Sequence, residues 1–370
     1  MPIGSEAIDL FRLLRLIGLA VSLALAPQLA GAQSPNLGKP QFDDRQQVLA
    51  IYATVKVLFN NEDFMTLEKF ADEFRILGSV TSSGLPNLDA YYGAFNSYPI
   101  TGEMSDPRID KTKRWLAAYP NSRTAHIVMG ILLEYRTLAL TQLGGNSVLA
   151  GTKALYDTVP AKIEQGYRDT EQFLTDNESL LRDEPYYYGL KIDIAARRGA
   201  KEDEILALYK SAETQFPGYF QPKYQALLWL SRFWNDDPKK IDAFITAATE
   251  ASRAQNGEGD YADLYWWHHV LHANSNLFTQ TKVNWPRLRR GIEDRIKRFG
   301  GSSNANRYAM LACLAGNKAV ALFEMIGNTF DPEVWYTQQT LDQCWLWALL
   351  DVGGPLGRFS EAREPATLNR

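Results

Sequence analysis

The sequence has little of several features that mark common classes of protein. Its formal net charge is -4, so there is no basic excess, and we expect no binding to nucleic acid. Runs that alternate apolar and polar residues are scarce, which argues against a β-sheet. Beyond Ala32 no apolar stretch is long enough to span a bilayer, so no integral membrane segment is expected there. These absences favour an all-α fold.

One apolar run does occur, at the N-terminus, and it has the order of a secretory signal peptide. Arg12 and Arg15 precede the apolar residues 16–26, and Ala30-Gly31-Ala32 follow. Positive charge, an apolar core and small residues in that order are typical of a cleaved signal. The alternative is an anchor helix that stays in the membrane, for which the run is short. We expect residues 1–32 to be removed, and the protein to be periplasmic or secreted by a bacterium.

Pairs of amphipathic patterns, separated by short polar turns, recur along the rest of the chain. Apolar residues at spacings of three and four predict a helix on each side of the turns at Asn61, Gly199, Asn235 and Gly316. The distances between these turns are close to multiples of roughly 34–40 residues, the length of a helix-pair repeat. We therefore predict tandem antiparallel helix pairs over residues 44–351. An open superhelix and a closed bundle both satisfy the pattern.

Three further segments complete the expected organisation. Residues 33–43 are polar and contain proline and glycine, which predicts a flexible linker, and residues 352–370 predict a flexible C-terminal tail. In the middle of the chain, a helix capped by Asn121 is expected to end at Gly144-Gly145-Asn146. Pro160 is expected to kink or begin the helix after it.

Two stretches carry a resemblance to known families. Residues 217–251 and the segment Cys313–Ala319 resemble tetratricopeptide repeats, which implies an α-solenoid or superhelix. They lack the Gly/Tyr pair of that consensus, so the resemblance concerns the fold and brings no binding site. The chain also resembles a family of bacterial exported proteins that contain a domain of unknown function. That likeness rests on a set of residues near the two ends: Leu67, Gly84-Leu85, Tyr91-Tyr92, Trp335, Cys344, Trp345 and Trp347.

The best chemical candidate lies in residues 261–272. On a helix, His268 and His272 are one turn apart and can bind a metal such as zinc, with Asp260 or Asp263 as a third ligand. The zinc-protease pattern needs a glutamate where His269 stands. The alternative is a half-buried helix whose histidines bond to neighbours or stack on tryptophans. We assign no catalytic residue, metal or cofactor from sequence, and name as candidate ligand-binding residues Tyr261, Tyr265, Trp266, His268 and His272.

Aromatic residues are abundant, with 9 Trp, 18 Tyr and 17 Phe. The rings in the runs 186–188 and 266–267 cannot all face the core, because consecutive helical residues point about 100° apart. Some ring surface is therefore expected at an interface or on the wall of a groove that binds peptides, glycans or partner helices. The alternative is packing between neighbouring repeats.

The only two cysteines, Cys313 and Cys344, are about one repeat apart. Equivalent positions in successive repeats lie side by side, and an oxidising compartment permits a disulfide there. Two buried free thiols are the alternative.

These observations leave two functions open. The first is a non-catalytic periplasmic helical-repeat module that binds or assembles with a protein, peptide or other envelope ligand. The second is a cell-envelope hydrolase or metal-dependent enzyme centred on the helix of His268 and His272.

Overall fold

The computed structural model describes residues 44–96, 106–149, 153–272, 277–327, 331–335 and 337–350. In these ranges the chain forms helices and turns without a named strand, and one isolated bridge pairs Val80 with Pro86. The all-α prediction is confirmed. The described residues belong to one compact unit, and none of their helices is long and apolar enough to cross a membrane. The predicted signal peptide (1–32), linker (33–43) and tail (352–370) lie outside them.

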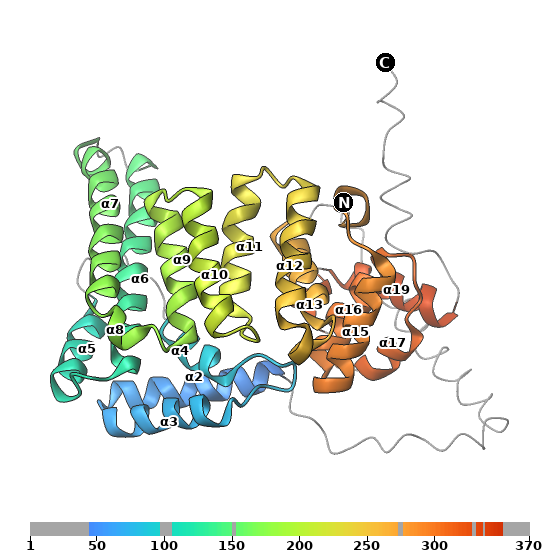
Figure 1. Ribbon diagram of the computed structural model, residues 1–370, viewed down its shortest axis with the longest axis horizontal. Coiled ribbons are helices and arrows are strands. Elements are labelled where there is room, and N and C mark those ends of the chain that lie inside the picture. Colours follow the sequence, from blue (N-terminus) through green and yellow to red (C-terminus); the bar gives the residue numbers. More distant parts are fainter. Residues whose placement is uncertain are drawn as a thin grey trace, which may run out of the picture. The chain divides into compact units, whose positions relative to one another are not determined.

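The helices follow one another in chain order with short connections (Figure 1). The first half contains α2 (Asp44–Asn60), α3 (Phe64–Leu77), α4 (Asn87–Asn96), α5 (Pro107–Ala118), α6 (Arg123–Leu149), α7 (Lys153–Asp176), α8 (Glu178–Leu181), α9 (Pro185–Arg198) and α10 (Glu202–Gln215). The second half contains α11 (Gln221–Phe233), α12 (Pro238–Asn256), α13 (Gly259–Leu271), α14 (Leu277–Gln280), α15 (Trp285–Phe299), α16 (Ser302–Leu314), α17 (Val320–Ile326), α18 (Pro332–Trp335) and α19 (Gln338–Leu350).

All four predicted turns lie between two helices that contact each other. They join α2 to α3, α9 to α10, α11 to α12 and α16 to α17. Gly78 and Gly199 end their helices with φ of 55° and 93°, a left-handed conformation that glycine adopts without a steric penalty. At the opposite end of α3, the side chain of Asp63 accepts a hydrogen bond from the backbone of Thr66 at 3.1 Å. Local turn and capping chemistry therefore fixes these boundaries.

The predicted boundaries in the middle of the chain are wrong. α6 continues through Gly144-Gly145 to Leu149. Pro160 does not begin the next helix but lies inside α7, which leaves the kink as the remaining alternative. Glycine in a helix costs only about 1 kcal/mol, and packing between α6 and α7 can offset this. The cap of α6 is Ser122 in place of Asn121, since the Ser122 hydroxyl accepts from the backbone of Ala125 at 2.8 Å.

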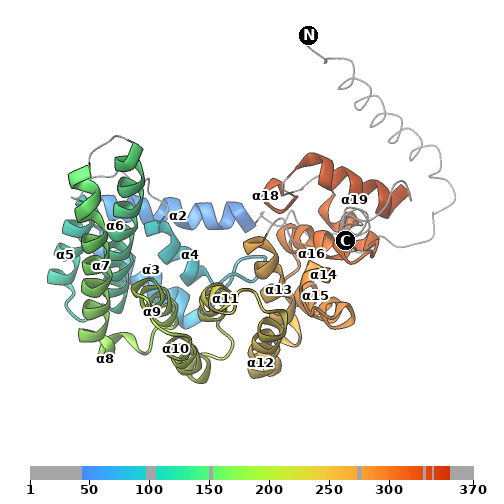
Figure 2. The ribbon, with the colours of Figure 1, turned by 90° about the horizontal axis from the view of Figure 1, so that it is seen from above.

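The helices from α6 onwards pack mainly on their neighbours in the chain. Contacts link α6 to α7 and α9, α9 to α10 and α11, α11 to α12 and α13, and α13 to α15. In Figure 2, α9 lies nearer to α4 than α10 does, and α11 lies nearer than α12 does. The two helices of a pair therefore differ in position. α9 and α11 lie towards the N-terminal helices, and α10 and α12 lie on the far side.

The N-terminal helices α2 and α3 run across the ends of these helices (Figure 1). Arg75 of α3 bonds to Glu184, just before α9, at 2.6 Å and to Thr124 of α6 at 2.7 Å. Farther along, Asn304 of α16 donates a hydrogen bond to the backbone carbonyl of Ser83 at 3.0 Å. The segment from α3 to α4 therefore touches helices from both halves of the chain.

A buried ion pair joins three helices of the second half. Lys223 of α11, 1% exposed, donates to Asp260 of α13 at 2.7 Å and to the carbonyl of Pro217 at 2.7 Å. Asp260 also accepts from Ser252 of α12 at 2.6 Å and from Asn256 at 2.9 Å. A buried charge is tolerated only when it is paired and bonded in this way.

We predict that Lys223→Met lowers the free energy of unfolding by about 3–5 kcal/mol, because it leaves the Asp260 carboxylate buried without its cation. Adding Asp260→Asn should recover part of this loss. Urea denaturation measures both effects, with the exposed Lys210→Met as the control. A midpoint for Lys223→Met equal to that of Lys210→Met would contradict the assigned role.

The two cysteines form a disulfide that links α16 to α19. Cys313 and Cys344 are both fully buried, and their Cα atoms lie 5.9 Å apart. The two cysteines are 31 positions apart in the sequence, so the bond closes a loop that contains α17 and α18.

Thiol titration of the denatured, unreduced protein should find no free thiol, and titration after reduction should find both. Replacing both cysteines by serine should lower the free energy of unfolding by about 4 kcal/mol, the loss expected for a loop of this length. Free thiols in the unreduced protein would show that the bond does not form.

Candidate functional site

The structure brings His268 and His272 together with an acid from a different helix pair. One side-chain donor atom from each of Asp236, His268 and His272 lies within 4.8 Å of the other two. The rings of His268 and His272 are 4.7 Å apart between centroids. His272 Nε2 is 3.1 Å from Asp236 Oδ1. This group, here called the histidine cluster, contains both predicted histidines and one residue that the sequence did not indicate.

Two helix ends position the histidine cluster. His268 and His272 are one turn apart at the end of α13, where His272 is the C-cap and its backbone N–H donates to His269 at 3.1 Å. Asp236 lies in the turn after α11 with φ of 55°, and its N–H donates to the carbonyl of Ser231 at 2.9 Å. The turn therefore holds the carboxylate beside the end of α13.

The three members of the histidine cluster differ in their exposure. His268 is 5% exposed, and among the described residues neither of its ring nitrogens has a hydrogen-bond partner. The side chains of His272 and Asp236 are 29% and 46% exposed. Burial, followed by the charges of His272 and His269, lowers the pKa of His268 to about 4. The imidazole of His268 is therefore neutral at pH 7, which is the form that binds metals.

Asp260 and Asp263, considered in the sequence as third ligands, are engaged elsewhere. Asp260 is in the ion pair with Lys223. Asp263 accepts a hydrogen bond from the hydroxyl of Tyr308 at 2.8 Å and an ion pair from Arg295 at 2.9 Å. Both carboxylates therefore hold helices together, and Asp236 takes the place beside the histidines.

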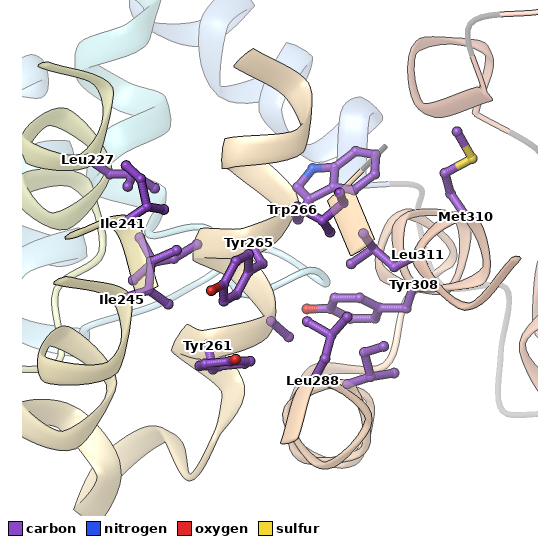
Figure 3. Packing of buried hydrophobic residues seen from close by; sticks show 14 of the residues in the cluster. Leu227, Ile241, Ile245, Tyr261, Tyr265, Trp266, Leu288, Tyr308, Met310 and Leu311 are labelled. Carbon is purple, nitrogen blue, oxygen red and sulfur yellow. The ribbon is translucent and has the colours of Figure 1, made fainter. Parts of the chain in front are cut away.

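The three predicted aromatic site residues lie in the core. Tyr261, Tyr265 and Trp266 are at most 4% exposed and pack among residues of α11, α12, α15 and α16 (Figure 3). Tyr265 donates to Asp242 at 2.6 Å, and the Tyr261 hydroxyl accepts from the backbone of Asn284 at 3.0 Å. Their rings fill space between helix pairs, which is the packing alternative weighed from the sequence.

A second polar cluster, which the sequence analysis missed, joins α6, α9 and α11. Asp193 of α9 accepts from Trp229 of α11 at 2.7 Å and from Arg197 at 2.8 Å. Glu134 of α6 lies 3.4 Å from Arg197. Burial, with the hydrogen bond and charge of Asp193, raises the pKa of Glu134 well above its ordinary value. Burial opposes ionisation of Asp193, but bonds from Glu134, Arg197 and Trp229 outweigh it and lower its pKa.

Four partly exposed aromatic side chains lie on α9, α11 and α13, and one of them, Trp229, bonds to Asp193 of this cluster. They are Tyr186 of α9, Tyr224 and Trp229 of α11, and Trp267 of α13, which together we call the aromatic row. Tyr224 and Trp267 contact each other at 4.8 Å between ring centroids. Arg197 and Arg232 lie 5.3 and 4.5 Å from the Trp229 ring. In each consecutive run, 186–188 and 266–267, one ring is partly exposed and the others are buried, as the helical geometry requires.

Comparison with protein-family models, with curated proteins and with solved structures finds no match to the chain. The geometry of the two clusters and of the aromatic row is therefore the basis for a functional proposal.

We predict that His268 and His269 each contribute a loss of stability as the pH falls from about 6.5 to about 4. Burial lowers the pKa of both His268 and His269 to about 4, so in this range each of these imidazoles binds a proton in the unfolded chain and not in the folded chain. Each histidine should contribute roughly 3 kcal/mol of destabilisation at the acid end. Urea denaturation at a series of pH values measures the effect.

The variant His269→Gln isolates the histidine contribution from that of carboxyl groups, some of which titrate in the same range because burial raises their pKa, to about 7 for Asp89. As the pH falls from about 6.5 to about 4, its free energy of unfolding should rise relative to that of the wild-type protein by the contribution of His269. Parallel slopes in the two proteins would mean that His269 is not the titrating group.

Proposed function

We propose that the protein is an exported helical-repeat module of the tetratricopeptide-like class, which binds an extended segment of a protein or peptide and has no chemistry of its own. The observation that carries this proposal is the aromatic row. Its rings come from three helices that are neighbours in space, α9, α11 and α13, and all of them are partly exposed. A ligand that lies across successive helices would meet one ring after another.

The surroundings of Trp229 suit a binding surface. Its indole N–H donates to Asp193, and two guanidinium groups flank the ring. The indole is therefore held in one orientation before a ligand arrives, which reduces the entropy lost on binding. Tryptophan, tyrosine and arginine are the residues that most often dominate the energy of protein interfaces.

The paired acids of this region support binding over catalysis. Asp193 accepts from Arg197 and Trp229, and Glu134 lies 3.4 Å from Arg197. Because these carboxylates are engaged by protein donors, their evident task is to orient Trp229 and Arg197. A general acid or base would need a free face towards its substrate.

The packing of the helices and the expected export fit the same proposal. Helix-pair repeats that contact mainly their neighbours present an extended surface, and such surfaces commonly bind peptides or partner proteins. The signal sequence expected in residues 1–32 would place this surface in the periplasm or outside the cell, where the ligand would be an envelope or secreted protein.

A peptide library displayed on phage and selected on the purified protein tests the proposal. Selected peptides should bind the wild-type protein, and Trp229→Ala combined with Trp267→Ala should weaken binding by about 2 kcal/mol, roughly 30-fold. The control is Trp345→Ala on α19, a tryptophan that is 40% exposed and outside the row.

Circular dichroism would verify that each variant keeps its helical fold. Peptides that bind the double variant as tightly as the wild-type protein would refute a role for the aromatic row. A selection that yields no saturable ligand would count against peptide binding altogether.

A further inference from the structure

We infer that Asp236, His268 and His272 form a binding site for one borderline divalent metal ion, with Zn²⁺ as the expected occupant. Two imidazoles and a carboxylate are a ligand set that suits zinc, and their donor atoms lie within 4.8 Å of one another. None of the three residues belongs to the aromatic row, so the site is independent of the proposed peptide binding.

The distances are close to those of a coordinated ion. In a tetrahedral zinc site with bonds of about 2.0–2.1 Å, two donor atoms are separated by about 3.3 Å. Asp236 Oδ1 and His272 Nε2 already lie 3.1 Å apart. The third donor, on His268, must approach by no more than about 1.5 Å, which a side-chain rotation can supply.

The burial of the His268 imidazole without a hydrogen-bond partner is the independent observation that points to a ligand. Its side chain is 5% exposed and faces the other two residues, yet neither ring nitrogen bonds to any described group. A buried polar group without a partner is unfavourable, and such groups in folded proteins call for an explanation. Coordination of a metal ion by one nitrogen would give this imidazole the partner that it lacks.

The ligand types select the kind of ion. Imidazole nitrogens favour zinc, copper and nickel, whereas magnesium and calcium prefer sites built from oxygen. Three protein ligands leave at least one position open, and the exposed side of Asp236 lets solvent or a small ligand reach it. The ion would join the turn between α11 and α12 to the end of α13, and so link successive helix pairs.

Isothermal titration of the tag-free, chelator-treated full chain with ZnCl₂ at pH 7.5 tests the site. We expect saturable binding of one ion per chain, and no binding of Mg²⁺ under the same conditions. Zn²⁺ should also raise the melting temperature, because it binds only the folded arrangement of the three ligands. A wild-type protein that binds no stoichiometric Zn²⁺ would overturn the inference.

Matched variants locate the ion. Asp236→Asn and His272→Gln change partly exposed side chains and should weaken Zn²⁺ binding at least about tenfold, since even the loss of an outer hydrogen-bond partner costs about 10–100-fold. His126→Gln on α6 and the exposed Asp203→Asn on α10 are the controls and should bind as the wild type does. Equal affinity in Asp236→Asn, His272→Gln and the controls would overturn the assignment of these ligands. Peptide binding is measured separately, so its failure would leave this result unaffected.

Discussion

The buried pair of Lys223 and Asp260 is the interaction on which the second half of the molecule depends. It sets the start of α13 against the start of α11, and Ser252 brings α12 into the same network. The histidine cluster is built at the opposite ends of α11 and α13, from the turn after one helix and the last turn of the other. A change in how these helices pack would therefore separate Asp236 from His268. Residues that never touch the cluster thus define its geometry.

Local features of the sequence were enough to predict the helix pairs. Apolar spacing gives the helices, and glycine or asparagine in a left-handed conformation gives the turns at Gly199 and Asn235. The same reasoning failed at Gly144-Gly145, because contacts between α6 and α7 outweigh the local cost of glycine there. The helix propensity of single residues is a weak predictor of where a helix ends when that helix packs along another long helix. The arrangement of α2 and α3 across the other helices was also beyond prediction, since it depends on contacts between distant residues.

Local spacing predicted only part of the candidate site, namely its two histidines. His268 and His272 share one helix face, a relation that the spacing in the sequence shows directly. Asp236 joins them only through packing of α13 against the turn after α11, and nothing near Asp236 in the sequence marks it as a ligand. Two nearer acids, Asp260 and Asp263, were the natural choices, and both turned out to bond to cations in the interior. For the aromatic row, the sequence predicted only that some rings in the runs 186–188 and 266–267 could not face the core.

The contact between Ser83 and Asn304 has a consequence for how the chain folds. These residues are 221 positions apart, and arrays of helix pairs normally fold through contacts between near neighbours. Here the segment between α3 and α4 acquires one of its partners only when α16 has formed. A ribosome or a translocation pore delivers the N-terminal end first, so α2 to α4 would wait for the last third of the chain before completing their packing. Their contacts with α6 and with Glu184 can form earlier, so the segment around Ser83 would be the part of the N-terminal helices that is completed last.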